Sequence, residues 1–262
     1  MHRLKLFFAI AVILALVACG GEEEAGPIAV SENTPLPFPE ATTTPLTVEA
    51  LTKLTVPQGP VPVPTIRSFA VGSGPISLLY HDGAMLIVNQ NDDSLTRLAL
   101  DGSEIWTKPL LGYPSTLASD GESLWAGTHF AIKKLSPDAN EQGSWQAGRH
   151  PVAIVFGGGY VWVANNQDNM VSRIASDGAL RNIQVGSQPT ALAYDGDAVW
   201  VANHSDNTLT KLSSNGEVLE TFPTGNGPEG LAFDGSHIWV TNSFDATVSK
   251  LTLSGELVGT YT

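Results

Sequence analysis

Six side chains are the best candidates for chemistry, because they differ between otherwise similar stretches of the chain. They are Tyr113, His129, His150, Gln188, His204 and Glu229. An imidazole can act as a general base or bind a divalent ion, and a neighbouring carboxylate can take part in either role. The sequence has no glycine-rich phosphate loop, no nucleophile elbow and no zinc-type spacing. Two kinds of function remain open for these residues: a binding surface, or a catalytic site that uses the histidines.

A repeat of about forty residues positions these side chains. It opens with a proline at 75, 114, 151, 189 and 228, at intervals of 39, 37, 38 and 39 residues. Eleven residues after the proline stand Leu86, Trp125, Trp162, Trp200 and Trp239, and fourteen after it stand Asn89, Thr128, Asn165, Asn203 and Asn242. Seventeen residues after the proline, four copies carry an aspartate: Asp92, Asp168, Asp206 and Asp245. Because they recur, we interpret the tryptophans as packing between units and the Asn and Asp side chains as bonding their own turn backbones.

Each copy contains four strand-like runs. In the fourth copy they are residues 192–194, 199–201, 209–212 and 218–222, with turns at Asp195-Gly196 and Asn215-Gly216. Asp-Gly and Asn-Gly favour tight hairpins, because both turn residues take positive φ. Four antiparallel strands per repeat predict an all-β fold, a β-propeller of four-stranded antiparallel blades.

Five full blades are predicted between residues 74 and 262. Residues 65–71 and 258–261 both look like fourth strands, and Leu51-Thr52-Lys53-Leu54 echoes another strand of the repeat. A ring needs only one closing strand of this kind. We therefore expect a partial extra blade near residues 50–72, in a ring that is six-blade-like or imperfectly closed.

The repeat resembles known propeller families. V-W-V-A-N at 161–165 and 199–203 and W-V-T-N at 239–242 resemble YVTN and NHL-like repeats, and G-P-x-G-L-A-F-D-G at 227–235 is similar to virginiamycin B lyase-like proteins. The resemblance spans residues 74–262 and implies the propeller fold. Such lyases use His and Glu with a divalent ion, and their repeat typically carries a glutamate after the second strand. Here that position is Asn in four copies and Thr128 in the second, so the catalytic residues do not carry over.

The varying residues occupy two places in the repeat. The residue after the repeated Asn is Gln90, Asn166, His204 or Ser243, with His129 in the second copy; the residue before the proline is Gly74, Tyr113, His150, Gln188 or Gly227. In a propeller both places open on one face. The six candidates, with Glu229 among them, are therefore predicted to converge around one mouth of the axis as a ligand-binding face. We predict no cofactor and no metal site.

The N-terminus predicts export and lipid anchoring. Arg3 and Lys5 precede an apolar run at 6–17 that is short for a bilayer span but suits a signal peptide. The run ends in L-V-A-C at 16–19, which resembles a bacterial lipobox and implies cleavage before Cys19 and its lipidation. The predicted organisation is a signal peptide at 1–18, an acidic, Pro/Thr-rich tether at 19–64 and the propeller at 65–262.

Charge and cysteine content narrow the partners. Cleavage would leave 11 basic and 26 acidic residues, a formal net charge of −15, which disfavours nucleic acid. Cys19 is the only cysteine, so the chain can form no internal disulfide. We expect an extracytoplasmic bacterial protein, held at the membrane by the Cys19 lipid anchor, whose propeller is a binding scaffold for an unknown protein, peptide or glycan. The alternative, which the resemblance implies, is a metal-assisted lyase or hydrolase of the virginiamycin B lyase-like type.

Overall fold

The computed structural model describes residues 67–129 and 131–262. The predicted signal peptide at 1–18, the predicted tether at 19–64 with Cys19, and residues 51–54 lie outside the described residues. The described part contains five four-stranded sheets, which are called blades 1 to 5 in chain order. It also contains the short 3-10 helix η2 (Asn166–Asp168).

The twenty strands of the described part follow one another in simple order. Blade 1 consists of β1 (Pro75–His81), β2 (Ala84–Asn89), β3 (Ser94–Ala99) and β4 (Glu104–Pro109). Blade 2 consists of β5 (Thr116–Ser119), β6 (Leu124–Gly127), β7 (Ile132–Leu135) and β8 (Glu141–Trp145). Blade 3 consists of β9 (Pro151–Gly157), β10 (Tyr160–Asn165), β11 (Met170–Ile174) and β12 (Leu180–Gln184). Blade 4 consists of β13 (Pro189–Tyr194), β14 (Ala198–Asn203), β15 (Thr208–Ser213) and β16 (Val218–Pro223). Blade 5 consists of β17 (Pro228–Phe233), β18 (His237–Asn242), β19 (Thr247–Thr252) and β20 (Leu257–Tyr261).

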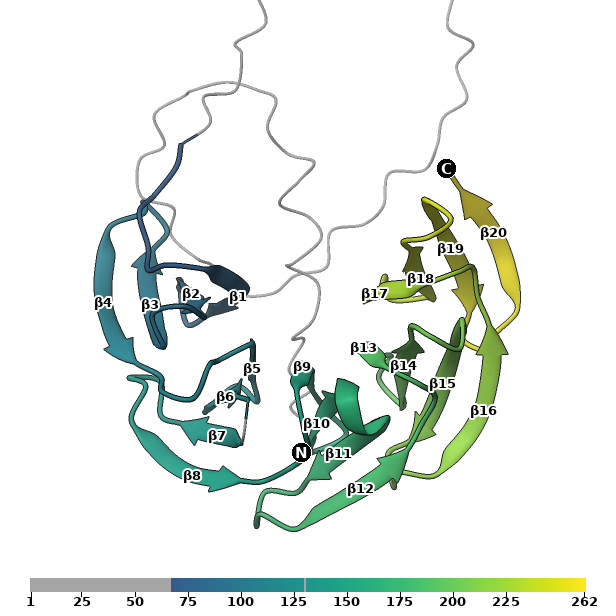
Figure 1. Cartoon of the computed structure of the whole chain (residues 1–262), viewed down its shortest axis with the longest axis horizontal. Coiled ribbons are helices and arrows are strands. Elements are labelled where there is room, and N and C mark those ends of the chain that lie inside the picture. The colour runs from purple at the N-terminus through teal and green to yellow at the C-terminus, as the bar shows by residue number, and fades with distance from the viewer. Residues whose placement is uncertain (1–66, 130) are drawn as a thin grey trace, which may run out of the picture. The chain divides into compact units, whose positions relative to one another are not determined.

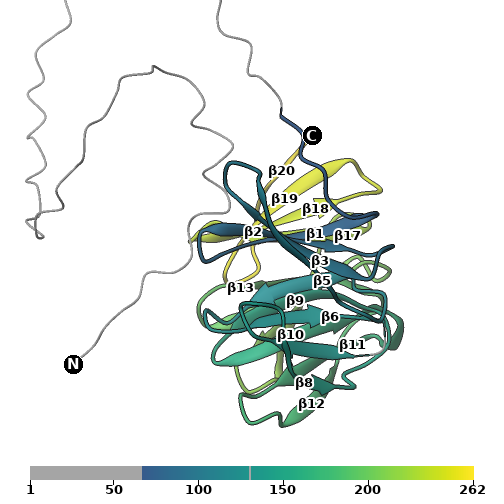
Figure 2. The same ribbon diagram turned by 90° about the vertical axis from the view of Figure 1, so that its left-hand side faces the viewer.

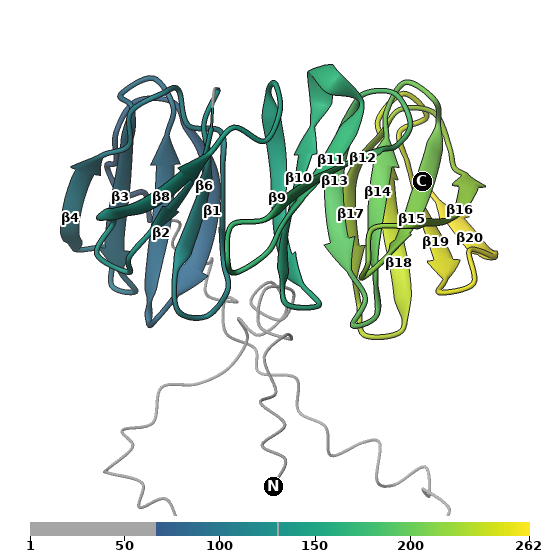
Figure 3. The ribbon, with the colours of Figure 1, turned by 90° about the horizontal axis from the view of Figure 1, so that it is seen from below.

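Every blade is an antiparallel meander in which sequential strands are neighbours. The prediction of an all-β fold with five four-stranded antiparallel blades is therefore confirmed. In Figure 3 the strands run between two faces of the molecule, so that turns and connections gather on those faces. In the described part, no helix is long and apolar enough to cross a membrane.

The turn between the first two strands holds the tryptophan of its blade. In blade 4 the Asp195 carboxylate accepts bonds from backbone N–H groups of the turn and from Trp200 Nε1, at 2.8 Å. The same contact joins Asp120 to Trp125 and Asp234 to Trp239. In blade 3 the carbonyl of Gly157 replaces the aspartate and accepts from Trp162 Nε1 at 3.0 Å. The Asp-Gly turn therefore orients the indole as well as reversing the chain.

The core lies between neighbouring blades. Trp200 and Leu209 of blade 4 pack in one cluster with Ile238 and Leu251 of blade 5. Trp125, Trp162 and Trp200 are at most 2% exposed. The interpretation of these tryptophans as packing between blades is confirmed, and burial of rings this large stabilises each interface by several kcal/mol, roughly 3–5 for one indole.

The repeated asparagine is buried at the end of the second strand. Asn203 Nδ2 donates to Thr208 Oγ1 at 3.1 Å and to Thr210 Oγ1 at 2.9 Å. The corresponding amides are those of Asn89, Asn165 and Asn242, which also donate to hydroxyls of the third strand. The structural role is confirmed, but the partners are side-chain hydroxyls of the next strand and not the turn backbone.

The repeated aspartates also have other partners than predicted. They bond the connector, the chain that leads from one blade to the first strand of the next. Asp168 accepts from the backbone N–H of Arg149 at 2.7 Å, and Asp206 accepts from that of Ser187 at 2.7 Å. The backbone N–H and then the guanidinium of Arg149 lower the pKa of the Asp168 carboxyl. The expected bond to the aspartate's own turn is wrong, because the connector lies within reach and offers unpaired N–H groups.

The five blades form an arc (Figure 1). The first strands lie side by side in the order β1, β5, β9, β13 and β17 (Figure 1), and Figure 2 shows β1, β5 and β9 following one another along the molecule. Among the described residues no comparable contact joins β17 to β1. The space between blades 5 and 1 is called the gap.

The expected partial blade has a mixed outcome. Its residues 50–66 lie outside the described residues. Residues 67–71, predicted to continue a fourth strand, contain no strand, so that part of the prediction is wrong. A strand requires a hydrogen-bonded neighbour, which residue pattern alone does not supply. Residues 257–261 form β20, the fourth strand of their own blade, as predicted.

Candidate ligand-binding face

Two kinds of loop meet at one edge of every blade. One loop joins the second strand to the third, and the other is the connector. Backbone hydrogen bonds hold them together: His129 N donates to Gly112 O at 2.8 Å, and His204 N donates to Gln188 O at 3.1 Å. Asn166 N donates likewise to the carbonyl of His150. Both loops therefore open on the same side of the blades, which is called the connector face.

The residue before each repeated proline is in the left-handed conformation. Its φ is 65° at Gly74, 58° at Tyr113, 55° at His150, 53° at Gln188 and 64° at Gly227. Glycine adopts this conformation freely, whereas a residue with a Cβ atom is destabilised there by about 1–2 kcal/mol. Three connectors thus present a side chain at a position where glycine would be relaxed.

Side chains of the neighbouring turn fix the backbone at these positions. Tyr113 N donates to Asp93 Oδ1 at 2.6 Å, and Gln188 N donates to Asn169 Oδ1 at 2.9 Å. These bonds use the main chain of the connector and not its side chain. The conformation at these two positions is therefore held through the main chain, and the residues Tyr113 and Gln188 are exposed.

His129 and His150 form one group of predicted residues. Their ring centroids lie 6.4 Å apart, with a tilt of 59° between the planes. They come from neighbouring units, since His129 follows β6 and His150 directly precedes β9. His150 Nδ1 is buried and has no hydrogen-bond partner in the described part of the chain.

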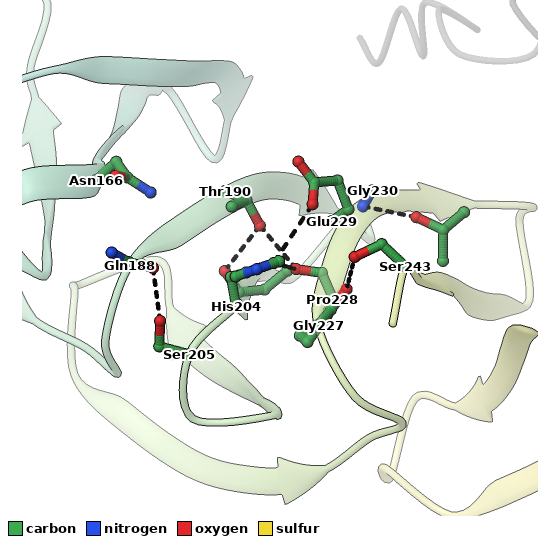
Figure 4. Close-up of polar contacts among 12 residues, drawn as sticks. Asn166, Gln188, Thr190, His204, Ser205, Gly227, Pro228, Glu229, Gly230 and Ser243 are labelled. Atoms are coloured by element: carbon green, nitrogen blue, oxygen red, sulfur yellow. Dashed lines mark hydrogen bonds and ion pairs between the residues drawn. The ribbon is translucent and has the colours of Figure 1, made fainter. Parts of the chain in front are cut away.

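His204 and Glu229 form a second group (Figure 4). His204 Nδ1 lies 3.4 Å from Glu229 Oε2 and 3.3 Å from the carbonyl of Pro228. The Phe244 ring packs edge-on against the imidazole, with centroids 5.0 Å apart. His204 Nδ1 therefore faces two oxygen atoms, one from a carboxylate and one from a backbone carbonyl.

Gln188 joins the second group through a neighbouring hydroxyl. Ser205 Oγ donates to Gln188 Oε1 at 2.6 Å, so this amide oxygen is turned toward the turn that carries His204 (Figure 4). On the other side, Asn166 Nδ2 donates to the carbonyl of Pro189 at 3.2 Å. Side chains at the varying positions therefore reach from one blade to the start of the next.

An open depression with a volume of about 520 Å³ lies between the connectors of blades 3 and 4. It is lined by Arg149, Asn166, Gln167, Asn169, Ser187, Gln188 and Ser205. Gln188 is the predicted site residue in this lining. Most of the others lie one or two positions from a varying residue, which is the signal that could have identified them.

The described residues do not offer a metal centre. No group of three or more His, Cys, Asp or Glu side chains in residues 67–129 and 131–262 is close enough to hold an ion. The two histidine groups come from different blade junctions, since His129 and His150 lie where blade 2 meets blade 3 and His204 lies where blade 4 meets blade 5. The donor set therefore does not fit the divalent ion of the alternative function.

Solved structures share the arrangement of blades. Virginiamycin B lyase from Staphylococcus aureus superposes with a TM-score of 0.64 at 19% identity, over 72% of this chain and 70% of the lyase. Its catalytically inactive H270A variant with Quinupristin matches equally well. A functionally unknown protein from Desulfotomaculum acetoxidans has a TM-score of 0.61 at 14% identity, over 71% of each chain. This chain folds as a β-propeller.

At these identities the likeness extends to the propeller fold alone. No family model and no curated protein matches the chain. The function of this propeller must therefore be argued from its own connector face.

Proposed function

We propose that the protein is a lipid-anchored propeller that binds a protein, peptide or glycan on its connector face at the bacterial cell surface. The left-handed conformation of Tyr113, His150 and Gln188 carries the proposal. Local backbone strain clusters at the functional sites of rigid scaffolds, and glycine at Gly74 and Gly227 meets the same backbone requirement without strain. The purpose we assign is contact with a ligand.

The chemistry of the depression supports a polar ligand. Amides at Asn166 and Gln188 both donate and accept hydrogen bonds, the Ser205 hydroxyl does the same, and Arg149 adds a cation that is 73% exposed. Phe244, on the same face, is also 73% exposed and offers a flat apolar surface. Hydroxyl-rich or amide-rich ligands match such a mixture.

Arrays of bacterial glycans and of peptides, probed with the full chain in detergent, would identify the ligand class. We expect Arg149→Ala and Asn166→Ala each to weaken binding of the best array hit about tenfold, the equivalent of ~1.4 kcal/mol. Arg181→Ala, on β12 and away from the depression, is the control. Equal affinity of all three variants would contradict a site at the depression.

The anchoring part of the proposal rests on the L-V-A-C sequence at 16–19. Two or more acyl chains at Cys19 would hold the protein stably on a membrane. Fractionation of cells that express Cys19→Ser should find the protein in the soluble fraction, with the wild type in the membrane fraction. Membrane association of both would contradict the anchor and leave the binding proposal untouched.

A second candidate function follows from the His204–Glu229 pair. A carboxylate beside Nδ1 orients an imidazole so that Nε2 can remove a proton, as a lyase or hydrolase requires. Incubation with quinupristin, followed by mass spectrometry, tests this directly. Turnover that is lost in His204→Ala and retained in His237→Ala would favour the enzyme, whereas unchanged quinupristin would favour the scaffold.

A further inference from the structure

Arg149 departs from the repeat at one position of the connector. Two residues before the repeated proline, the five copies carry Ser73, Gly112, Arg149, Ser187 and Asn226. In four of these copies the backbone N–H at this position donates to an aspartate of the turn after the second strand. Since that backbone bond is made with serine, asparagine or arginine alike, the fold does not require the arginine side chain. A cation is therefore present here in the connector that enters blade 3, and in no other copy.

The guanidinium of Arg149 is held on one side and open on the other. Asp168 Oδ1 accepts from Arg149 Nε at 2.6 Å, and Asp168 Oδ2 accepts from Arg149 N at 2.7 Å. The side chain of Asp168 is 15% exposed, whereas that of Arg149 is 73% exposed. Within residues 67–129 and 131–262, neither Nη atom of Arg149 has a hydrogen-bond partner. The aspartate thus orients the arginine and leaves the two Nη amino groups to a ligand.

Two amide groups add N–H donors to the same depression. Asn169 Oδ1 accepts from the backbone N–H of Gln188 at 2.9 Å, so the Nδ2 amino group of Asn169 is left for another partner. Gln188 Oε1 accepts from Ser205 Oγ at 2.6 Å, and Gln188 Nε2 lies on the side of the amide away from Ser205 (Figure 4). Neither amino group has a hydrogen-bond partner in the part of the chain that the structure describes. Arg149, Asn169 and Gln188 therefore all offer donors at the depression.

The charge of the depression is opposite to that of the chain. Its lining, among the described residues, contains one cation, six uncharged polar side chains and no carboxylate. The two neighbouring aspartates, Asp168 and Asp206, are engaged with backbone N–H groups of the connectors. The depression also lies away from the gap, so that the blades on both of its sides are in place. Because the formal net charge of −13 disfavours anions at long range, recognition of an anion here depends on short, charge-assisted hydrogen bonds.

We propose that the depression binds the carboxylate of an acidic sugar, a uronic acid residue of a glycan; the inference rests on the proposed binding function and narrows its ligand. A guanidinium receives a carboxylate through two parallel hydrogen bonds. The surrounding amides and the hydroxyls of Ser187 and Ser205 both donate and accept, as the hydroxyls of a sugar require. No apolar side chain is among the described lining residues, which disfavours a peptide that would bury apolar groups.

A matched pair of ligands tests the role of the carboxylate. Calorimetry with the full chain in detergent compares a trisaccharide of galacturonic acid with its methyl ester, which has the same sugars without the charge. We expect the acid to bind at least about tenfold more tightly than the ester. Arg149→Ser introduces the residue that two other copies carry and keeps the backbone bond to Asp168, so it should remove this preference without changing the affinity for the ester. Arg181→Ser, on β12 and outside the lining, is the control and should keep the preference.

The outcomes separate this inference from the wider proposal. Equal affinity of the wild type for acid and ester, binding of neither, or a preference that survives Arg149→Ser would overturn the acidic-sugar site. A triglutamate peptide carries a similar charge, and tighter binding of this peptide than of the acidic trisaccharide would overturn the assignment to a glycan. In each of these cases the binding function itself would still stand if an array ligand bound the wild type and was weakened by Asn166→Ala.

Discussion

Two adjacent positions in each blade differ sharply in how they are used. Asn203 is fully buried and donates to two threonine hydroxyls, and its buried counterpart Asn242 donates to the hydroxyls of Thr247 and Ser249. The next residue is His204 in one blade and Ser243 in the other, and each lies at the rim of the connector face. One step along the chain thus separates a buried position with a constant residue, which we call the floor, from a position at the edge of the connector face where the residue varies. The varying positions, including the connector residue before each repeated proline, are called the rim.

The difference shows how a repeat protein gains a specific surface without losing its fold. The floor is constrained because its polar atoms are buried and must be paired. The rim is held by backbone bonds, such as Ser243 N to Gly227 O at 2.8 Å, which any side chain permits. Variation is therefore tolerated at the rim, and the substitutions below are expected to separate the two regions.

Trp200→Ala should have the largest effect on stability. Removing a fully buried indole that packs between two blades costs about 3–5 kcal/mol in the free energy of unfolding. Urea denaturation followed by circular dichroism measures it. Tyr113→Ala at the rim, where the ring is 53% exposed, should change stability by less than about 0.5 kcal/mol. Similar losses in both variants would remove the distinction between core and rim.

Asn203→Ala should destabilise the propeller by about 2–3 kcal/mol, because it leaves the Thr208 and Thr210 hydroxyls without their shared partner. The matched variant is Asn166→Ala, which removes one part-buried bond to a carbonyl at the rim. We expect that variant to lose no more than about 1 kcal/mol. A larger loss of stability for Asn166→Ala than for Asn203→Ala in the same urea titration would contradict the assignment of the floor to Asn203.

Gly227→Ala tests the backbone requirement of the connector. Alanine at this position would have to adopt a φ of 64°. Its Cβ atom would lie 2.9 Å from the Phe244 and Ser243 side chains. We expect a loss of about 1–2 kcal/mol. Gly159→Ala, where φ is 82° and no atom lies within 4 Å, isolates the cost of the conformation from that of the contact. A Gly227→Ala variant as stable as the wild type would argue against strain at this position.

The smallest expected effect is a change of stability with pH. It arises from Asp234, at the edge of the blades opposite the connector face. The indole N–H of Trp239, together with backbone N–H groups of the turn, lowers the pKa of Asp234 to about 2. A depressed pKa stabilises the fold above the unfolded value of about 3.9, and that contribution is lost as the pH falls through about 2. The Tm of Asp234→Asn should therefore fall less than the Tm of the wild type when the pH is lowered from about 5 to about 2. Parallel Tm profiles for the variant and the wild type would contradict this role.

Much of the fold could be predicted because the repeat carries its own turn chemistry. Asp195-Gly196 marks a hairpin locally, and the recurring tryptophans mark an interface without knowledge of the partner blade. Contacts between side chains of different blades were harder to predict from the sequence. Glu229 stands 25 residues after His204, and only the packing of blade 5 on blade 4 brings them within 3.4 Å.

The left-handed connector position could have been predicted from the sequence. Gly74 and Gly227 at the same repeat position indicate a backbone that needs positive φ, and this extends to His150 and Gln188. The strand predicted at 65–71 failed in its described part for a different reason. Its residue types suit a strand, but pairing depends on a neighbour that lies elsewhere in the chain.

The central claim is that the connector side chains are kept for binding and not for stability. Gln188→Gly and His150→Gly test it most directly, because glycine relaxes φ while it deletes the side chain. Each variant should unfold at the same temperature as the wild type or slightly higher, yet bind the best array hit at least about tenfold more weakly. Asp82→Gly, at φ of 46° in the first turn of blade 1, gives the same backbone relief at the opposite edge and should bind normally. Unchanged affinity in both His150→Gly and Gln188→Gly would contradict the account. A clear loss of stability in these variants would contradict it as well.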